Sequence, residues 1–156
     1  MSETNNEFWR FSITLWDQQP LRSCLMTLQD ELNLDINLAL FATWCASKNL
    51  SFEGNHALIM NKAQQWSGNI VQPIRQIREL CKQSEASSAL YTSLLDTELK
   101  AEQYYQEALF ELSHQLTPSK RDKHATLVSN LTAMTNLVLE SDSSDALVEC
   151  LSEAIK

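Results

Sequence analysis

The sequence has very few of the residues that make tight turns, with two glycines and three prolines among 156 residues. Sheet proteins need turns rich in glycine and proline, and α/β proteins need them in their loops. Their scarcity predicts long helices joined by short connections. It also excludes glycine-rich phosphate loops and dinucleotide-binding fingerprints, because Gly54 and Gly68 are the only glycines. We expect one all-α domain over residues 1–156, built as an orthogonal or up-down bundle of six or seven helices.

The chain also lacks an excess of positive charge, since its formal net charge is −8. This disfavours a nucleic-acid partner, which is bound by neutralising its phosphates with Lys and Arg. Residues 1–85 carry nine acids and seven bases, whereas residues 86–156 carry eleven acids and five bases. All four tryptophans lie in the first half. We therefore expect an aromatic-rich core region at residues 7–82 and an acidic helical extension at residues 86–156.

Signals for a membrane, for secretion and for bound metal are absent as well. No apolar run approaches the roughly 20 residues that cross a bilayer, and the chain opens on polar residues rather than a signal segment. The four cysteines form no C-x-x-C pair and predict small buried side chains. Glu111 and His114 have the i, i+3 spacing of a di-iron ligand pair, but no second pair exists, so they indicate a solvated helix face. We expect a reduced, cytoplasmic protein with no cofactor, no metal and no membrane partner.

Apolar periodicity predicts where the helices lie. The expected helices are Glu7–Trp16, Pro20–Leu32, Ile36–Lys48, Ala57–Lys82, Ala89–Leu116, one that starts at Thr117-Pro118 with Val138 in its buried stripe, and a short last helix after a turn at Ser141–Ser144. The third is the most hydrophobic, and we expect it at the centre with Asp35 as its N-cap. Gly68 and Pro73 predict a kink or a split near residues 68–73. Buried apolar positions expected in the two long helices include Ile70, Ile74, Ile77, Cys81, Leu90 and Leu94.

A cationic stripe follows Pro73. Arg75, Arg78 and Lys82 are spaced i, i+3 and i+7 beside the apolar seam of the predicted fourth helix. Guanidinium groups in this arrangement can grip a carboxylate or phosphate, or can dock an acidic partner. They can equally pair within the protein, with Asp30, Asp35 or Glu79, and internal pairing is the favoured interpretation.

Asp30 and Asn37 are the polar residues near the central helix that turns and caps do not explain. A polar side chain against so apolar a surface must find a hydrogen-bond partner if it is buried. Arg75 or Arg78 would supply one. We therefore predict contact between these arginines and the pair Asp30 and Asn37.

The aromatic residues outnumber what one small core usually requires. Most of them should be buried, and those left exposed would mark a groove for a partner or ligand. The tryptophans chosen as candidates for such a groove are Trp9, Trp44 and Trp66.

Short motifs across residues 7–82 give the chain a family resemblance. They are Phe8-Trp9-Arg10-Phe11-Ser12, Leu28-Gln29-Asp30, Asp35-Ile36-Asn37-Leu38, Leu40-Phe41, Trp44, Trp66, Pro73 and Arg75-x-x-Arg78. The combination resembles a proteobacterial family that is known only as a domain of unknown function. That resemblance implies no activity and no catalytic residue. It implies that these polar residues belong to the family's pattern and matter for fold or function.

The leading functional hypothesis is a non-enzymatic protein-binding or adaptor module, because no catalytic motif is present. The alternative is a small-molecule binding protein or enzyme that holds an acidic amphipathic ligand between Arg75, Arg78 and a Trp-lined core. A third hypothesis is a homodimer formed through the first helix or through Ala89–Leu116.

Overall fold

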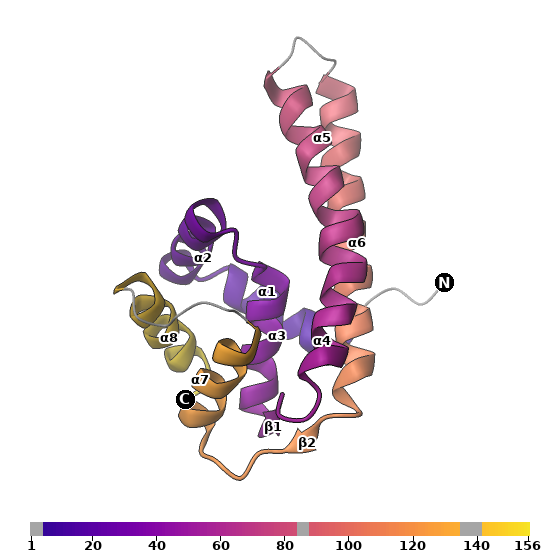
Figure 1. Cartoon of the computed structure of the whole chain (residues 1–156). Coiled ribbons are helices and arrows are strands. Elements are labelled where there is room, and N and C mark those ends of the chain that lie inside the picture. Colours follow the sequence, from indigo (N-terminus) through magenta and orange to yellow (C-terminus); the bar gives the residue numbers. More distant parts are fainter. Residues whose placement is uncertain (1–4, 84–87, 135–141) are drawn as a thin grey trace.

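The computed structural model describes residues 5–83, 88–134 and 142–156, and within these it is almost entirely helical (Figure 1). Its elements are α1 (Glu7–Trp16), α2 (Gln19–Leu32), α3 (Ile36–Ser47), β1 (Leu50–Ser51), α4 (His56–Ala63), the π-helix η1 (Gln64–Val71), α5 (Gln72–Gln83), α6 (Ser88–Ser113), β2 (Thr117–Pro118), α7 (Lys123–Met134) and α8 (Asp142–Ala154). Since α4, η1 and α5 run on without a break, the described residues form seven helical rods. The predicted all-α fold is confirmed.

Helix α3 runs through the centre of the molecule, as predicted. Every residue from Asn37 to Ala46 is buried, so this helix is covered on all sides. Asp35 caps it, because its Oδ1 accepts a hydrogen bond of 3.1 Å from the backbone N–H of Leu38. The preceding turn uses Asn33 in the left-handed conformation (φ 54°), which asparagine tolerates better than most residues. Helices α1, α6 and α7 pack around α3.

Aromatic rings fill the centre of the core. Phe41 lies 5.3 Å from Phe8 and 5.6 Å from Phe52, measured between ring centroids. Trp44 extends the cluster to Phe110 of α6, at 5.6 Å. Both halves of the chain contribute to the same core, since buried leucines of α6, α7 and α8 pack with those of α1, α2 and α3.

The predicted interruption near residues 68–73 is a π-helix rather than a sharp kink. Pro73 has no N–H with which to bond the carbonyl four residues before it, so a regular α-helix is disfavoured there. In the structure, the N–H of Gln72 instead reaches back five residues to the carbonyl of Ser67. The wider turn of η1 carries the chain into α5, and π-helical segments of this kind are frequent at functional sites.

Helices α5 and α6 form an antiparallel hairpin that projects beyond the rest of the molecule (Figure 1). The lower half of α6 packs against α1, α3 and α4. The upper half has α5 beside it, and α5 contains no buried residue. The prediction that Ile70, Ile77 and Leu90 are buried is wrong: their exposed fractions are 37%, 51% and 48%.

The prediction that a helix starts at Thr117-Pro118 is also wrong. These residues form β2, which pairs antiparallel with β1 in the register Leu50 to Pro118 and Ser51 to Thr117. The helix begins later, at Lys123, and Asp122 caps it by accepting a hydrogen bond of 2.8 Å from the N–H of Ala125. The buried side chain of Asn130 then ties α7 to β1 by donating to the carbonyl of Leu50 at 3.1 Å.

The C-terminal helix starts earlier than expected. The predicted turn at Ser141–Ser144 is replaced by helix from Asp142 onward, while residues 135–141, including Val138, lie outside the described residues. Helix α8 packs against α2 and α7. Of the four cysteines, Cys45 is fully buried, whereas Cys24, Cys81 and Cys150 are half-buried.

Candidate functional site

A cluster of ionised side chains lies between α5 and α6. Glu98 of α6, whose exposed fraction is 8%, bridges two arginines of α5. Its Oε1 accepts a hydrogen bond of 2.9 Å from Nε of Arg75, and its Oε2 accepts one of 2.5 Å from Nε of Arg78. Arg78 also donates to Glu79, one residue along its own helix, at 2.6 Å. Charge-assisted bonds of this kind are among the strong polar contacts in proteins, so Glu98 fixes the two helices against each other.

A second carboxylate joins this cluster one turn further along α6. Glu102 accepts a hydrogen bond of 3.3 Å from Nη2 of Arg75 and is hydrogen-bonded to Asn37 of α3. Burial raises the pKa of Glu102 to about 7, since it disfavours the charged form. The positive charge of Arg75 lowers this pKa, but the negative charges of Glu98 and Asp35 raise it. Glu102 is thus a carboxyl group that changes its charge near neutral pH.

Asp35 connects the same region to the start of α3. Besides capping the helix, it accepts a hydrogen bond of 2.7 Å from the hydroxyl of Tyr105, and it is also hydrogen-bonded to Ser67 of the π-helix. Burial raises the pKa of Asp35, although these hydrogen bonds and the charge of Arg75 favour its ionised form. Burial beside this carboxylate likewise raises the pKa of Tyr105 well above its usual value. Asp35 therefore joins α3, η1 and α6.

Asn37 is buried and bonded, but not to an arginine. Its Oδ1 accepts a hydrogen bond of 2.8 Å from Nε2 of Gln106, which is buried as well. The expectation that Asn37 must find a partner is confirmed, whereas the expected partner is wrong. We call the whole group the polar cluster: Asp35, Asn37, Arg75, Arg78, Glu98, Glu102, Tyr105 and Gln106.

The polar cluster lies within the part of the chain that is matched by a known family. A family model described as "Protein of unknown function (DUF2390)" matches residues 7–109, well over half of the chain. The chain belongs to the DUF2390 family. No curated protein and no solved structure matches it. The DUF2390 match runs past residue 82, where the resemblance in the sequence ended, and takes in the residues of α6 that complete the polar cluster.

The structure of this DUF2390 domain brings together three of the predicted site residues and leaves others apart. Arg75, Arg78 and Asn37 meet in the polar cluster. Asp30 is exposed on α2 and forms no ion pair with either arginine among the described side chains, so its predicted contact is wrong. Lys82 is exposed near the far end of α5. The favoured interpretation of the arginines, internal pairing, is confirmed, but their main partners are acids of α6.

The three candidate tryptophans have different environments. Trp44 is buried in the core, between the rings of Phe8 and Phe110. Trp9 is half-buried on α1. Trp66, also half-buried, lies in the π-helix and stacks on the ring of Tyr104, with centroids 6.2 Å apart and planes 12° apart. They do not line a common groove.

The acids of α6 were missed in the sequence although they carry a signal. Glu98, Glu102 and Tyr105 are spaced i, i+4 and i+7, which places them on one face of a helix. Arg75 and Arg78 share a face of the neighbouring helix in the same way. Two helices joined by a short link pack antiparallel, so a basic stripe on one and an acidic stripe on the next indicate an ion-paired hairpin.

An unusual amount of apolar surface lies on the same hairpin. Ten large hydrophobic side chains are exposed among the described residues, and seven of them fall between residues 70 and 104. These seven are Ile70, Ile77, Leu80, Leu90, Leu95, Leu99 and Tyr104. Exposed apolar groups gathered in this way mark interaction sites in soluble proteins more often than isolated ones do.

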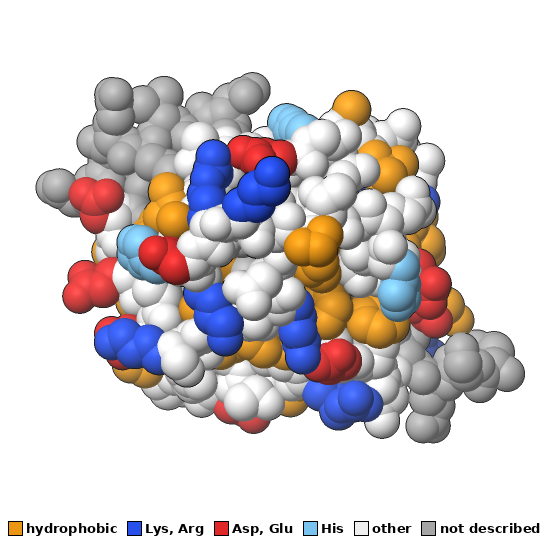
Figure 2. All heavy atoms as spheres, turned by 90° about the horizontal axis from the view of Figure 1, so that it is seen from below, with side chains coloured by type: hydrophobic (Ala, Val, Ile, Leu, Met, Phe, Trp, Pro, Cys, Tyr) orange, Lys and Arg blue, Asp and Glu red, His pale blue; other side chains and the backbone are white. Residues whose placement is uncertain are grey.

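The opposite end of the molecule looks different. Figure 2 shows this end from below, with basic and acidic side chains interspersed and apolar ones in separate patches between them. Two ion pairs here join Arg121 to Glu53 and Lys48 to Glu7.

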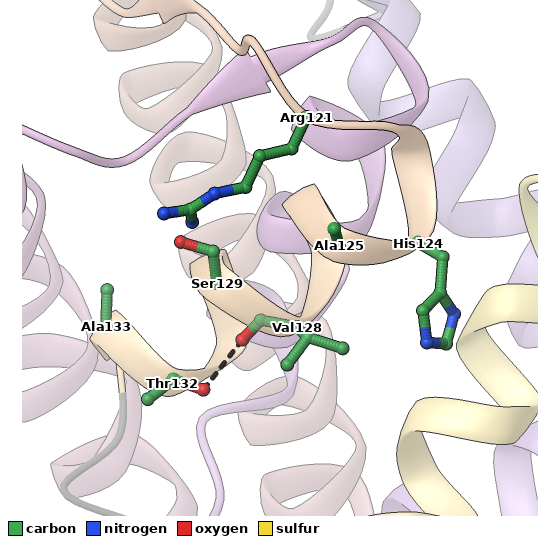
Figure 3. Close-up of a pocket in the computed structure, with 7 residues that line it drawn as sticks. All are labelled: Arg121, His124, Ala125, Val128, Ser129, Thr132 and Ala133. Carbon is green, nitrogen blue, oxygen red and sulfur yellow. Dashed lines mark hydrogen bonds between the residues drawn. The ribbon is translucent and has the colours of Figure 1, made fainter.

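A shallow hollow of about 580 Å³ lies along α7 (Figure 3). It is lined mainly by small and apolar side chains, with Arg121 and His124 at one end. Arg121 pairs with Glu53 at 3.0 Å, and Nδ1 of His124 contacts the hydroxyl of Ser152 at 3.0 Å. The two basic side chains at the end of the hollow therefore already have partners within the protein.

The described residues contain neither a group of metal ligands nor a membrane-spanning helix. Across residues 5–83, 88–134 and 142–156, no group of three or more His, Cys, Asp or Glu side chains is placed to hold a metal ion. His114 is exposed, with Nδ1 directed at the backbone carbonyl of Glu111. Within those ranges no helix combines the length and the hydrophobicity needed to span a bilayer.

Proposed function

We propose that this DUF2390 protein is a protein-binding or adaptor module, and that the α5–α6 hairpin is the element with which it contacts another protein chain. The supporting observation is that α5 contains no buried residue, while seven large hydrophobic side chains lie exposed on residues 70–104. Moving such a side chain from full exposure to full burial is worth roughly 1.5–3 kcal/mol, and since these side chains are 37–67% exposed, covering one of them contributes about half of that. A partner that covers several of them therefore gains a substantial driving force.

The polar cluster supports this proposal by holding the hairpin in a fixed position. Glu98 and the two arginines join α5 to α6, and Asp35 with Asn37 joins α6 to the buried helix α3. A binding element that is rigid before binding loses less conformational entropy when a partner docks. The cluster thus acts as the base from which the hairpin is presented.

The alternative, an acidic ligand gripped by Arg75 and Arg78, is less well supported. Both guanidinium groups already bond to the carboxylate of Glu98 within the protein, and Arg75 also bonds to that of Glu102. A ligand would have to displace these carboxylates and leave them buried without cations, which is strongly unfavourable. The exposed hairpin needs no such rearrangement in order to bind.

Quantitative affinity capture from a lysate of the natural host tests the proposal. The baits are the wild-type chain, the double variant Ile77→Glu/Leu90→Glu on the hairpin, and the control Met26→Glu on α2, where an exposed methionine lies far along the chain from the hairpin. We expect a specific set of proteins that the wild type and the control capture equally and the double variant loses. Equal capture by all three baits would contradict the proposal.

A further inference from the structure

The hairpin carries two apolar stripes that lie on one side. In the fourth rod, Ile70, Ile74, Ile77 and Cys81 follow one another at heptad spacing. In α6, the matching stripe is Leu90, Leu94, Thr97, Ala101 and Tyr104. The stacking of Trp66 on Tyr104 places both stripes on the same side of the hairpin. We call the residues of the two stripes, together with Trp66, the hairpin face.

The hairpin face points away from the body of the protein. Helix α3 lies on the other side of α6, because Asn37 contacts Glu102 and Gln106 there. Leu95 and Leu99 lie on the same side of α6 as Glu102 and Gln106, because helical spacing places these four residues in one stripe. A molecule that docks on the hairpin face is therefore not obstructed by α3.

The hairpin face contains no charged residue, although the chain has a formal net charge of −8. The charged residues of α5 and α6 fall outside its two stripes. A basic partner would be attracted to the acidic protein as a whole, but this face offers it no carboxylate to pair with. Two copies of an acidic chain repel each other, and this repulsion is weakest where they meet at a surface that is free of acids. The charge pattern therefore favours a contact between identical faces.

We propose that the hairpin face binds the same face of a second copy of this chain and that the two hairpins form a four-helix bundle. This inference rests on the proposed function and names the partner. Each hairpin supplies two antiparallel helices with seams of near-heptad spacing, and an identical hairpin supplies the other two. A two-fold axis brings the same patch of both copies together, so an uncharged apolar surface is complementary to itself.

The size of the face predicts a dimer that dissociates on dilution. The stripe from Leu90 to Tyr104 is about 20 Å long at 1.5 Å per residue, and two helices side by side are about 20 Å wide. Such a footprint, about 400 Å², is roughly half of the ~800 Å² that each partner buries in a standard stable interface, so we expect a weak dimer. Its exposed large hydrophobic members are Ile70, Ile77, Leu90 and Tyr104.

Sedimentation velocity of the full chain, from low micromolar to near-millimolar concentration, tests the inference. We expect the wild type to pass from the monomer mass of 17.8 kDa to twice that mass. Ile77→Glu and Leu90→Glu should each weaken association by at least tenfold, because a charge would be buried without a partner. Leu99→Glu is the matched control, since Leu99 is as exposed as Leu90 (46% and 48%) but lies on the side of α3. Circular dichroism establishes that each variant is folded, and the milder Leu90→Gln should weaken association less than Leu90→Glu.

Each outcome decides between the two proposals. A wild type that stays monomeric at the highest concentration overturns the second copy as partner. If the double variant Ile77→Glu/Leu90→Glu nevertheless fails to capture proteins that the wild type captures from lysate, the protein-binding function is kept, and the hairpin face binds another protein instead of a second copy. Equal weakening by Leu99→Glu and Leu90→Glu also overturns the inference, because added charge and not the hairpin face would then control association.

Discussion

Tyr105 donates a hydrogen bond of 2.7 Å to the carboxylate of Asp35, which joins the middle of α6 to the first turn of α3. The same carboxylate caps α3 through the N–H of Leu38. One side chain thus satisfies a helix end and anchors a neighbouring helix. Because α6 forms half of the hairpin, this bond helps to set where the hairpin leaves the body of the protein.

We expect Tyr105→Phe to lower the free energy of unfolding by about 1–3 kcal/mol, because the buried carboxylate of Asp35 loses a donor that nothing replaces. Urea denaturation followed by circular dichroism measures this change. The matched control is Tyr104→Phe at the next position, where the ring is exposed and its stacking on Trp66 is kept. The control should change stability by less than about 0.5 kcal/mol. Equal effects at both positions would contradict the role of the hydrogen bond.

Glu98 is expected to contribute more to stability than other acids of α6. In Glu98→Gln, Arg75 and Arg78 remain in place without the charge that bridges them, and removing one partner of a buried pair is destabilising by about 3–5 kcal/mol. Both arginines keep contacts with other acids, Glu102 and Glu79, so we expect a loss toward the lower limit. Chemical denaturation measures it.

The control for this variant is Asp96→Asn. Asp96 pairs with Lys100 at 3.5 Å on an exposed part of the same helix. Exposed pairs at this spacing contribute about 0.5 kcal/mol or less, so the control should change little. A loss at Glu98 no larger than the loss at Asp96 would show that the polar cluster does not hold the hairpin.

The raised pKa of Glu102 predicts how stability depends on pH. The pKa of Glu102 is about 7 in the folded protein, whereas the ordinary pKa of a glutamate is 4.5. Between these values the folded state binds more protons than the unfolded state, so this group stabilises the protein at low pH and its contribution is lost as the pH rises to about 7. Arg75, Glu98, Asp35 and Asn37 are the groups that face it.

Glu102→Gln should remove this pH dependence, because the amide keeps an acceptor for Arg75 but cannot ionise. Between pH 4.5 and pH 7.5 the wild type should lose ~2–3 kcal/mol of unfolding free energy relative to the variant. Urea titrations at several pH values measure that difference. A difference that stays constant over the range would show that Glu102 does not titrate there.

Local signals in the sequence were enough to predict much of the helical framework. The range Glu7–Trp16, the cap at Asp35 and the buried central helix follow from hydrophobic periodicity and capping chemistry. The two-residue strands β1 and β2 could not be predicted in this way, because their pairing joins residues more than sixty positions apart. The same is true of Asn130, whose buried hydrogen bonds exist only after α7 has packed beside β1.

The candidate site was predicted less completely than the fold. Charge and spacing predict Arg75, Arg78 and Asn37, but periodicity does not say which of several acids a cation meets, so the predicted contact with Asp30 is wrong. Ile77 and Leu90 show a second limit of sequence patterns. An apolar stripe predicts that a helix face will be buried. It does not say whether that face packs against another part of the same chain or against another molecule.

The final prediction concerns the thiols of Cys24 on α2 and Cys150 on α8, which share a hydrogen bond across the contact between these helices. Burial and the neighbouring thiol raise the pKa of Cys24, so its reactive thiolate is scarce at neutral pH. We expect diamide at mildly alkaline pH to join them. Two thiols lose two protons and two electrons to form one disulfide, and diamide takes them up to become the hydrazine. Peptide mapping should find the Cys24–Cys150 crosslink and a loss of two hydrogens.

The crosslink would close a loop of more than a hundred residues and should raise the melting temperature, since a bond of this loop length stabilises a protein by about 3–5 kcal/mol in the chain-entropy account. Cys24→Ser supplies the control, and its melting temperature should not respond to diamide. Cys45 should remain a thiol throughout, because burial raises its pKa well above the usual value and closes it off from the reagent. Mixed crosslinks that include Cys45, or crosslinks between chains in place of the Cys24–Cys150 bond, would contradict this arrangement of α2 and α8.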